Sequence, residues 1–357
     1  MSSTLVIRAD SDVRIGTGHV MRCMALAQAW QDAGGRVLHV GRIAAPSLAD
    51  RLARERIEST VIESESGSGA DAAFTAAFAR GCEAEWIVAD GYQFRRDYQR
   101  ALADGCARVL VVDDFAHASE YVADVVLDQN LGASESIYAQ RSATTRLLLG
   151  PQFSLLRREF ARWRDWRRMI APVGFRVLVT LGGSDPDNQT FKVIEALKRV
   201  KTKGLEAVIV AGGGNPHREQ LASAVKEAGA NFRLIVDATD LDAHMAWADL
   251  AVAASGSTSW ERALLGLPSL VVVLAENQKR IAAALDETEC AINLGCAHEL
   301  GVHVLAEQIE SLLGNRNRRT RLAECSRRLV DGRGAERVVE ALIQLKTQPH
   351  AHYLFRE

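Results

Sequence analysis

The sequence lacks the features that mark proteins for export, for structural zinc or for a polyanionic partner. Its six cysteines are scattered, with no C-x-x-C pair and no paired histidines at zinc-finger spacing, so we expect reduced, mostly structural thiols. Lys and Arg number 43 against 45 Asp and Glu, and the net charge of -2 offers no general attraction to nucleic acid or anionic lipid. The N-terminus shows no signal-peptide pattern, and the longest apolar runs are far shorter than the ~20 residues that span a bilayer. These absences predict a cytoplasmic protein without membrane insertion.

Short apolar runs rich in β-branched residues alternate with longer amphipathic stretches along the 357 residues. This alternation is typical of βαβ units around a parallel sheet, and the length suits two domains of roughly 150 residues each. The expected strands are 5–8, 36–40, 86–90, 108–113 and 124–128, then 176–181, 206–211, 232–236, 249–253 and 269–274. The sequence therefore predicts an α/β protein with two Rossmann-like, doubly wound domains.

The predicted division of the chain has four parts. Residues 1–150 form an N-terminal Rossmann-like domain and 174–335 a C-terminal one. Between them, 151–173 are rich in Arg and Trp and lead into Pro172 and Gly174, which break helices and indicate a linker. Residues 336–357 form a last helix and tail. Loops at the carboxyl ends of parallel strands gather ligands, so we expect a ligand in a cleft between the two domains.

The turn after the first expected strand contains Gly16, Gly18 and His19. The glycines permit a tight turn and a close ligand approach, and free N–H groups at the following helix start favour an anionic or electron-rich ligand. A lone histidine is ordinarily a packing or capping residue, but the glycine frame and the nearby Asp10 and Asp12 favour catalysis here. A neutral imidazole can take a proton from water when a carboxylate orients the ring. We therefore predict that His19 is a general base.

Two other features of this segment are weaker. The dinucleotide fingerprint G-x-G-x-x-G fails because Met21 stands at the third glycine position, which disfavours NAD. Arg14 and Arg22 are either anion contacts or ordinary surface and helix residues, and the sequence leaves both readings open. Neither arginine is included among the predicted site residues.

Three later strand ends in the first half carry polar side chains, at residues 90–92, 113–117 and 128–130. Aspartates at such positions commonly cap turns or helices. Because the carboxyl ends of parallel strands open onto one cleft, three polar ends together favour a binding site that includes Asn130.

In the second half, turns rich in glycine and hydroxyl groups follow the expected strands. Gly182, Gly183 and Ser184 open a helix, so their amides and hydroxyl can cradle a phosphate, although this is no Walker loop because G-K-[ST] is absent. Thr258 and Glu261 open a later helix with capping-box spacing, and a structural cap and a diphosphate site remain alternatives there. The carboxylate of Glu261 can also accept two hydrogen bonds from a ribose diol. The predicted nucleotide-binding residues are Gly182, Gly183, Ser184, Ser255, Gly256, Ser257, Thr258, Glu261, Asn277 and Gln278.

Taken together, these segments resemble the UDP-sugar hydrolase family of pseudaminic acid biosynthesis, whose substrate is UDP-2,4-diacetamido-2,4,6-trideoxy-β-L-altropyranose, and the related spore-coat polysaccharide proteins. The second half is also similar to the donor-binding domain of MurG-type transferases. The matching segments are 8–11, 15–19 with Arg22, 89–92, 113–114, 182–185, 255–261, 266–268 and 276–278. The resemblance implies a GT-B arrangement with UDP on the C-terminal domain and a last helix that returns to the first domain.

The resemblance also implies roles for particular residues. His19 would be the catalytic base, with Asp10 and Tyr92 near the sugar. Glu261 would bind the ribose, and Ser184, Ser257 and Thr258 would contact the phosphates. The expected reaction is hydrolysis of the UDP-activated diacetamido-trideoxyhexose with inversion at the anomeric carbon. It requires no cofactor and no catalytic metal, because amides and hydroxyls can stabilise the leaving diphosphate.

Other functions remain open at this point. A GT-B glycosyltransferase would use His19 to activate an acceptor hydroxyl instead of water, and a hydrolase could act on a related UDP-diacetamido sugar. A non-catalytic UDP-sugar sensor is the alternative from another class. We favour hydrolysis by a monomer or weak oligomer that supplies flagellin or surface-polysaccharide glycosylation, and the sequence assigns no function to the C-terminal tail.

Overall fold

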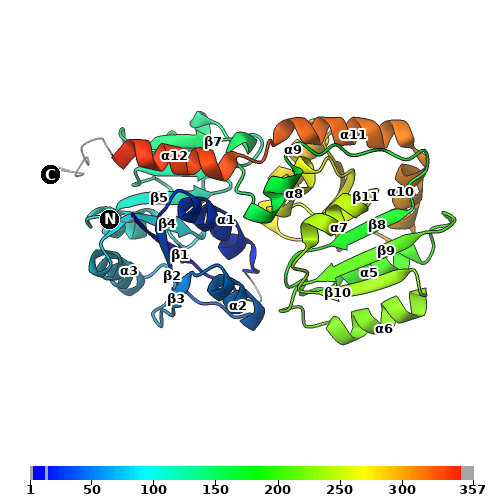
Figure 1. Cartoon of the computed structure of the whole chain (residues 1–357), viewed down its shortest axis with the longest axis horizontal. Coiled ribbons are helices and arrows are strands. Elements are labelled where there is room, and N and C mark those ends of the chain that lie inside the picture. Colours follow the sequence, from blue (N-terminus) through cyan, green and yellow to red (C-terminus); the bar gives the residue numbers. More distant parts are fainter. Residues whose placement is uncertain (1–2, 13–14, 347–357) are drawn as a thin grey trace. The chain divides into compact units, whose positions relative to one another are not determined.

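The structure is a computed structural model that describes residues 3–12 and 15–346. Arg14 and the tail beyond residue 346 lie outside the described residues. The chain forms two compact units, one made of residues up to Arg158 together with those from Gly332 onward, and one made of Glu159–Asp331. Each unit is a parallel sheet covered by helices (Figure 1).

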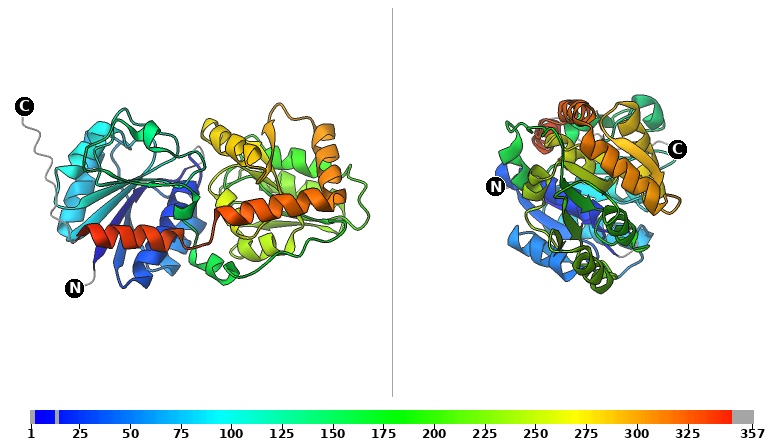
Figure 2. Two further views of the ribbon diagram at one scale, coloured as in Figure 1. Left: turned by 90° about the horizontal axis from the view of Figure 1, so that it is seen from above. Right: turned by 90° about the vertical axis from the view of Figure 1, so that its right-hand side faces the viewer.

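The N-terminal unit contains a seven-stranded sheet in the order β3-β2-β1-β4-β5-β6-β7, and every pairing in it is parallel. Its strands are β1 Thr4–Ala9, β2 Arg36–Val40, β3 Glu58–Thr60, β4 Ala84–Asp90, β5 Arg108–Asp113, β6 Val125–Asp128 and β7 Arg146–Leu149. Its helices are α1 Gly18–Asp32, α2 Pro46–Arg54, α3 Gly69–Gly81, α4 Arg96–Ala103 and α12 Gly334–Lys346. Helix α12 joins this unit although the rest of the unit ends at Arg158 (Figure 2).

The C-terminal unit contains a six-stranded parallel sheet in the order β10-β9-β8-β11-β12-β13. Its strands are β8 Arg176–Thr180, β9 Glu206–Ala211, β10 Phe232–Val236, β11 Leu250–Ala254, β12 Ser269–Val273 and β13 Ile292–Cys296. Its helices are α5 Gln189–Leu197, α6 Arg218–Ala228, α7 Leu241–Trp247, α8 Thr258–Leu264, α9 Lys279–Glu287, α10 Val302–Gly314 and α11 Arg316–Leu329. The predicted pair of doubly wound α/β domains is therefore confirmed.

The observed elements and limits differ from the expected ones in two respects. Strands β3, β7 and β13 were not expected, and each lies at an edge of its sheet. Residues 151–173, interpreted as a linker, are divided between the two units at Arg158. The reason is packing, because Leu155 lies in the core of the N-terminal unit.

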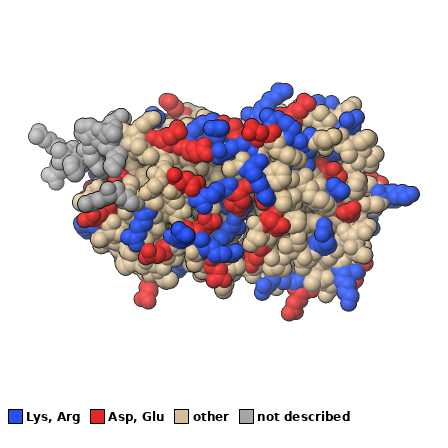
Figure 3. Space-filling view, in the orientation of Figure 1, with Lys and Arg blue, Asp and Glu red and all other residues tan. Residues whose placement is uncertain are grey.

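Charged side chains of both signs are mixed on the surface. On the face shown in Figure 3, Lys and Arg alternate with Asp and Glu. Within residues 3–12 and 15–346, no helix is both long enough and apolar enough to cross a membrane.

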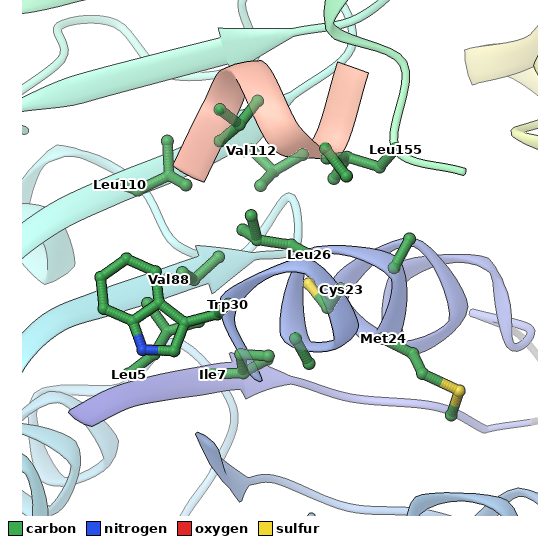
Figure 4. Close-up of a cluster of buried hydrophobic side chains, with 14 of the residues drawn as sticks. Leu5, Ile7, Cys23, Met24, Leu26, Trp30, Val88, Leu110, Val112 and Leu155 are labelled. Atoms are coloured by element: carbon green, nitrogen blue, oxygen red, sulfur yellow. The ribbon is translucent and has the colours of Figure 1, made fainter. Parts of the chain in front are cut away.

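One face of the first sheet packs against α1 and α12. Leu5 and Ile7 of β1 point to this face and contact Leu26 and Trp30 of α1 within one buried cluster (Figure 4). Val6, one residue along β1, joins a second cluster on the opposite face. This alternation follows from the two-residue period of a strand. The packing fixes α1 on the sheet, and it thereby fixes the side chains of the first turn of α1.

Candidate active site

The loop between β1 and α1 contains a glycine in the left-handed conformation and a turn that Asp12 closes. Gly16 has a φ of +75°, a conformation that a residue with a side chain adopts only with strain. Asp12 closes the turn, because its carbonyl accepts from the amide of Gly16 at 2.8 Å and its carboxylate accepts from the amide of Ile15 at 2.6 Å. Helix α1 then begins at Gly18, and this places the largely buried His19 in its first turn.

His19 forms a dyad with Asp90, the last residue of β4. The Nδ1 atom of His19 lies 2.6 Å from Oδ1 of Asp90, whose side chain is fully buried. Nη2 of Arg22 also lies 3.2 Å from Nδ1, but the contact with Asp90 is shorter, and an ionised carboxylate can only accept. We therefore assign Nδ1 as the donor to Asp90, and in that tautomer a neutral ring has an unprotonated Nε2. Nε2 is then the nitrogen that can take a proton from a nucleophile.

Arg22, one turn along α1 from His19, holds Asp90 in its ionised form. Its Nε and Nη2 atoms donate to the two oxygens of Asp90, each at 2.7 Å. Burial alone raises the pKa of Asp90, but the charges and hydrogen bonds of Arg22 and His19 outweigh it and hold this pKa far below its ordinary value. Asp90 therefore stays charged beside the imidazole at every pH at which the protein would work.

The partner of His19 differs from the one that the sequence analysis expected. Asp10 and Asp12 are close to His19 in sequence, but Asp12 closes the turn and Asp10 bonds to other residues. Asp10 accepts hydrogen bonds from Arg8 at 2.6 Å and from the amide of Arg42 at 2.8 Å, and Ser66 donates to its other oxygen. Because both of its oxygens are occupied, Asp10 shapes this part of the sheet edge, and its contact with a sugar remains a prediction.

Asp114 connects the dyad to the other strand ends. Its Oδ1 accepts from Arg22 at 2.7 Å and from the side chain of Asn130 at 2.8 Å, and its Oδ2 accepts from the hydroxyl of Tyr92 at 2.7 Å. The Tyr92 ring stands edge-on to the His19 ring, with 5.1 Å between the centroids. The structure thus brings together His19, Tyr92 and Asn130, which the sequence analysis proposed separately.

Arg22, Asp90 and Asp114 were missing from the predicted site. The spacing of His19 and Arg22, three residues apart on a helix, places both on one side of α1 and was the available signal. Asp90 and Asp114 were noted as polar strand ends and, like Arg22, as parts of the segments that carry the resemblance, but no role was assigned to them. The pairing of β1 with β4 sets Ala9 beside Asp90, and this register carries the carboxylate to the start of α1.

Asp128, at the end of β6, is the carboxylate in this group with a raised pKa. It accepts from the amide of Asn130 at 3.0 Å and from the hydroxyl of Tyr138 at 2.8 Å. Burial, with a further contribution from the charge of Asp114, raises the pKa of Asp128 to about 7.

This shift predicts a dependence of stability on pH. The folded pKa lies above the unfolded value of about 3.9, so the folded state binds the proton more tightly and loses stability as pH rises through 7. Relative to an Asp128→Asn variant, we expect wild-type stability to fall by up to about 1.4 kcal/mol per pH unit between pH 5 and 7. Urea unfolding of both proteins at pH 5, 6, 7 and 8 measures this difference. A difference that stays constant over that range would contradict the assignment.

The glycine loop after β8 is shaped by Asp185. Its carboxylate accepts from the amides of Gln189 and Thr190 at the start of α5, each at 2.8 Å. These helix amides are therefore not available to a phosphate, and the role predicted for Gly182, Gly183 and Ser184 stays a prediction. The groups that can still contact a phosphate belong to the loop before the helix, Gly182 to Ser184. In this loop Gly182 has a φ of +93° and Ser184 is partly exposed.

The loop after β11 does not form the capping box that was kept as an alternative. Ser257 is the N-cap of α8, and its side chain makes no capping hydrogen bond, while Thr258 is already helical. Gly256, Ser257 and Thr258 are partly exposed, and Glu261 is buried to 7% exposure. The hydroxyl groups of Ser257 and Thr258 therefore do not cap the start of α8.

A neighbouring loop is tied to this one. Ser255 donates from its buried hydroxyl to the carbonyl of Gln278 at 3.3 Å, and the side chain of Gln278 accepts from the amide of Leu274 at 3.1 Å. Asn277 is partly exposed beside it. Ser255 and Gln278 therefore fix the two loops to each other, and their contact with a nucleotide stays a prediction.

At the end of β13, Cys296 and the following His298 and Glu299 place a thiol, an imidazole and a carboxylate within 4.8 Å of one another. The sequence analysis did not expect this group. The side chains of His298 and Glu299 are 72% and 73% exposed, so nothing in their surroundings fixes a coordination geometry, and we assign no metal site to them.

Comparison with known proteins finds similarity to a glycosyltransferase domain, to a polysaccharide biosynthesis protein and to glycosyltransferases. Residues 177–338 match the model of the glycosyltransferase family 28 C-terminal domain. The chain is 28% identical over 244 residues to the spore coat polysaccharide biosynthesis protein SpsG of Bacillus subtilis, covering 68% of this chain and 71% of that protein. It is 30% identical over 161 residues to the UDP-N-acetylglucosamine–N-acetylmuramyl-(pentapeptide) pyrophosphoryl-undecaprenol N-acetylglucosamine transferase of Xanthomonas axonopodis, covering 41% of this chain and 38% of the transferase.

Similarity to solved structures extends over nearly the whole chain. The crystal structure of MurG from Acinetobacter baumannii superimposes with a TM-score of 0.64 at 19% identity, covering 96% of this chain and 99% of MurG. At this identity the likeness concerns the fold. The two parallel-sheet domains of this chain therefore have the GT-B fold, and the second of them resembles the C-terminal domain of family 28 glycosyltransferases.

Proposed function

We propose that this protein is an enzyme that cleaves a UDP-activated sugar at its anomeric carbon, with His19 as the base. The observation that carries the proposal is the dyad of His19 with Asp90, held by Arg22 at the carboxyl ends of β1 and β4. The match of the C-terminal unit to a glycosyltransferase domain supports a UDP-sugar as the substrate. The Xanthomonas relative is by name a UDP-N-acetylglucosamine transferase, and this supports the same class of substrate.

In the proposed reaction, His19 Nε2 removes the proton of an O–H nucleophile as its oxygen bonds to the anomeric carbon. The bond from that carbon to the phosphate oxygen breaks, the electron pair leaves with UDP, and the configuration inverts. Asp90 stabilises the imidazolium that forms. Donors of the 182–184 and 256–258 loops would stabilise the charge on the departing diphosphate.

Two nucleophiles fit this scheme. Transfer to an acceptor hydroxyl is favoured by the comparisons, because the matching domain model and the Xanthomonas relative are glycosyltransferases. Hydrolysis is favoured by the segment 8–22, whose motif resembles the hydrolases of UDP-2,4-diacetamido-2,4,6-trideoxy-β-L-altropyranose, and we propose that sugar as the substrate in this second case. Similarity to SpsG agrees with a role in the synthesis of a surface polysaccharide under either scheme.

The first experiment separates these two cases. We would incubate the pure protein with the UDP-diacetamido sugar, without acceptor, and follow UDP and free sugar by NMR, with and without EDTA. We expect stoichiometric UDP and free sugar of inverted configuration if water is the nucleophile. Binding of the UDP-sugar without release would assign the enzyme to transfer, and release would then require an acceptor. Tight binding with no turnover over a panel of UDP-sugars and acceptors would contradict an enzymatic role and indicate a UDP-sugar sensor.

A further inference from the structure

Arg262 is a buried cation beneath the loop of residues 255–258. It lies on α8 and is 2% exposed. Among the described residues, its recorded hydrogen bonds all end on neutral oxygens, namely the hydroxyls of Ser259, Ser269 and Thr258 at 3.1, 3.2 and 3.4 Å and the carbonyl of Ala254 at 3.2 Å. Burial lowers the pKa of Arg262 to about 10, although the nearby Glu261 acts in the other direction. The guanidinium is therefore still charged at neutral pH.

Three other buried arginines, Arg8, Arg22 and Arg319, have partners that balance their charge. Arg8 and Arg22 each donate to two carboxylates. Arg319 donates to the carbonyls of Leu312 and Leu313 at the end of α10, where the helix dipole is negative. Within residues 3–12 and 15–346, Arg262 donates to neither a carboxylate nor a helix C-terminus. A cation buried with neutral partners is costly unless an anion joins it.

The contacts of Arg262 also set the direction of the hydroxyl groups around it. A guanidinium can only donate, so it occupies a lone pair of the oxygens of Thr258 and Ser259. Their hydroxyl hydrogens then point elsewhere and are available to an acceptor. Thr258 is partly exposed on the loop, whereas Ser259 is buried. The hydroxyl of the partly exposed Thr258 can therefore donate to an anion.

We infer that Arg262 is a positioning residue for the diphosphate of the bound nucleotide, supplying the positive charge behind the loop and orienting the Thr258 hydroxyl toward the phosphate. The inference rests on the proposed function for its ligand class, a nucleoside diphosphate. It assigns the anion selectivity of this loop to a side chain that need not touch the ligand. The neutral nucleoside part of the ligand would not depend on Arg262.

The test compares ligands of different charge on the full-length protein. We would measure the affinity of UDP by calorimetry and that of UMP and uridine by ligand-detected NMR, for the wild type, Arg262→Gln and Arg262→Lys. Arg218→Gln, which removes an exposed arginine from α6 of the same unit, is the matched control for loss of one charge. For Arg262→Gln we expect roughly 10- to 100-fold weaker UDP binding, a smaller loss for UMP and no change for uridine. The UDP affinity of Arg262→Lys should lie between those of the wild type and Arg262→Gln, because lysine keeps the positive charge but lacks the planar guanidinium.

A double-mutant cycle separates positioning from packing. Thr258→Val alone should weaken UDP binding. In the double variant with Arg262→Gln, the loss of binding free energy for UDP should be smaller than the sum of the losses in the two single variants. Equal losses for UDP and uridine, or unchanged UDP binding, would overturn the inference. If Arg262→Gln does not fold, Arg262→Lys provides the test: its affinity for UDP should fall while its affinity for uridine stays at the wild-type value. Failure of the wild type to bind UDP at all would instead refute the proposed function.

Discussion

Replacing His19 by alanine is expected to slow UDP release by roughly 10²- to 10⁴-fold, with the affinity for UDP unchanged. The imidazole takes the proton of the nucleophile, so its loss affects the chemical step. The nucleotide contacts are proposed for the other unit and do not involve His19. Single-turnover release of UDP, followed by rapid quench, and calorimetric binding of UDP measure the two quantities separately.

Two further variants sharpen this prediction. Asp90→Asn should also reduce the rate, by at least about tenfold, because the uncharged amide neither fixes the His19 tautomer nor stabilises the imidazolium. His303→Ala removes an exposed histidine of α10 and should leave the rate at the wild-type value. A His19→Ala protein that releases UDP as fast as the wild type would remove His19 from the mechanism, whatever the behaviour of Asp90→Asn.

Arg22→Met is expected to lower the free energy of unfolding by about 3–5 kcal/mol, the largest loss of stability that we predict for a single substitution in this protein. Arg22 is 5% exposed and is the cation between the buried carboxylates of Asp90 and Asp114. Methionine fills a similar volume but leaves both carboxylates without their counter-ion. Urea unfolding at pH 7 measures the change in stability.

The matched control is Arg36→Met, because Arg36 forms an exposed ion pair with Glu58, with side-chain exposures of 53% and 75%. Exposed pairs of this kind contribute at most about 1 kcal/mol, and we expect a loss of stability within that limit. If the free energy of unfolding falls equally in the two variants, the ion pairs of Arg22 do not contribute the stability that we predict for them.

The sequence by itself was enough to identify the strands at the centre of both sheets. Strands such as β4 and β11 are buried on both faces, so they require continuous apolar runs that are visible without a structure. Two of the three missed edge strands, β3 and β13, were missed for the complementary reason, whereas the edge strand β10 was predicted. β3 is three polar residues long, and β13 contains a glycine at φ +81°, so neither has such a run.

The sequence also determined which residues are candidates for chemistry, because glycines and polar side chains at the ends of parallel strands converge on one edge of a sheet. Only the tertiary structure decided how those candidates pair. Neighbours in sequence suggested that Asp10 or Asp12 orients His19, whereas the register of β1 against β4 brings in Asp90 from 71 residues away. The resemblance implied a last helix that returns to the first domain, and packing places α12 there, since its apolar residues, Val338 and Leu342 among them, complete a core whose remaining buried residues lie before residue 156. Both outcomes depend on contacts between distant segments, which local patterns in a single sequence do not encode.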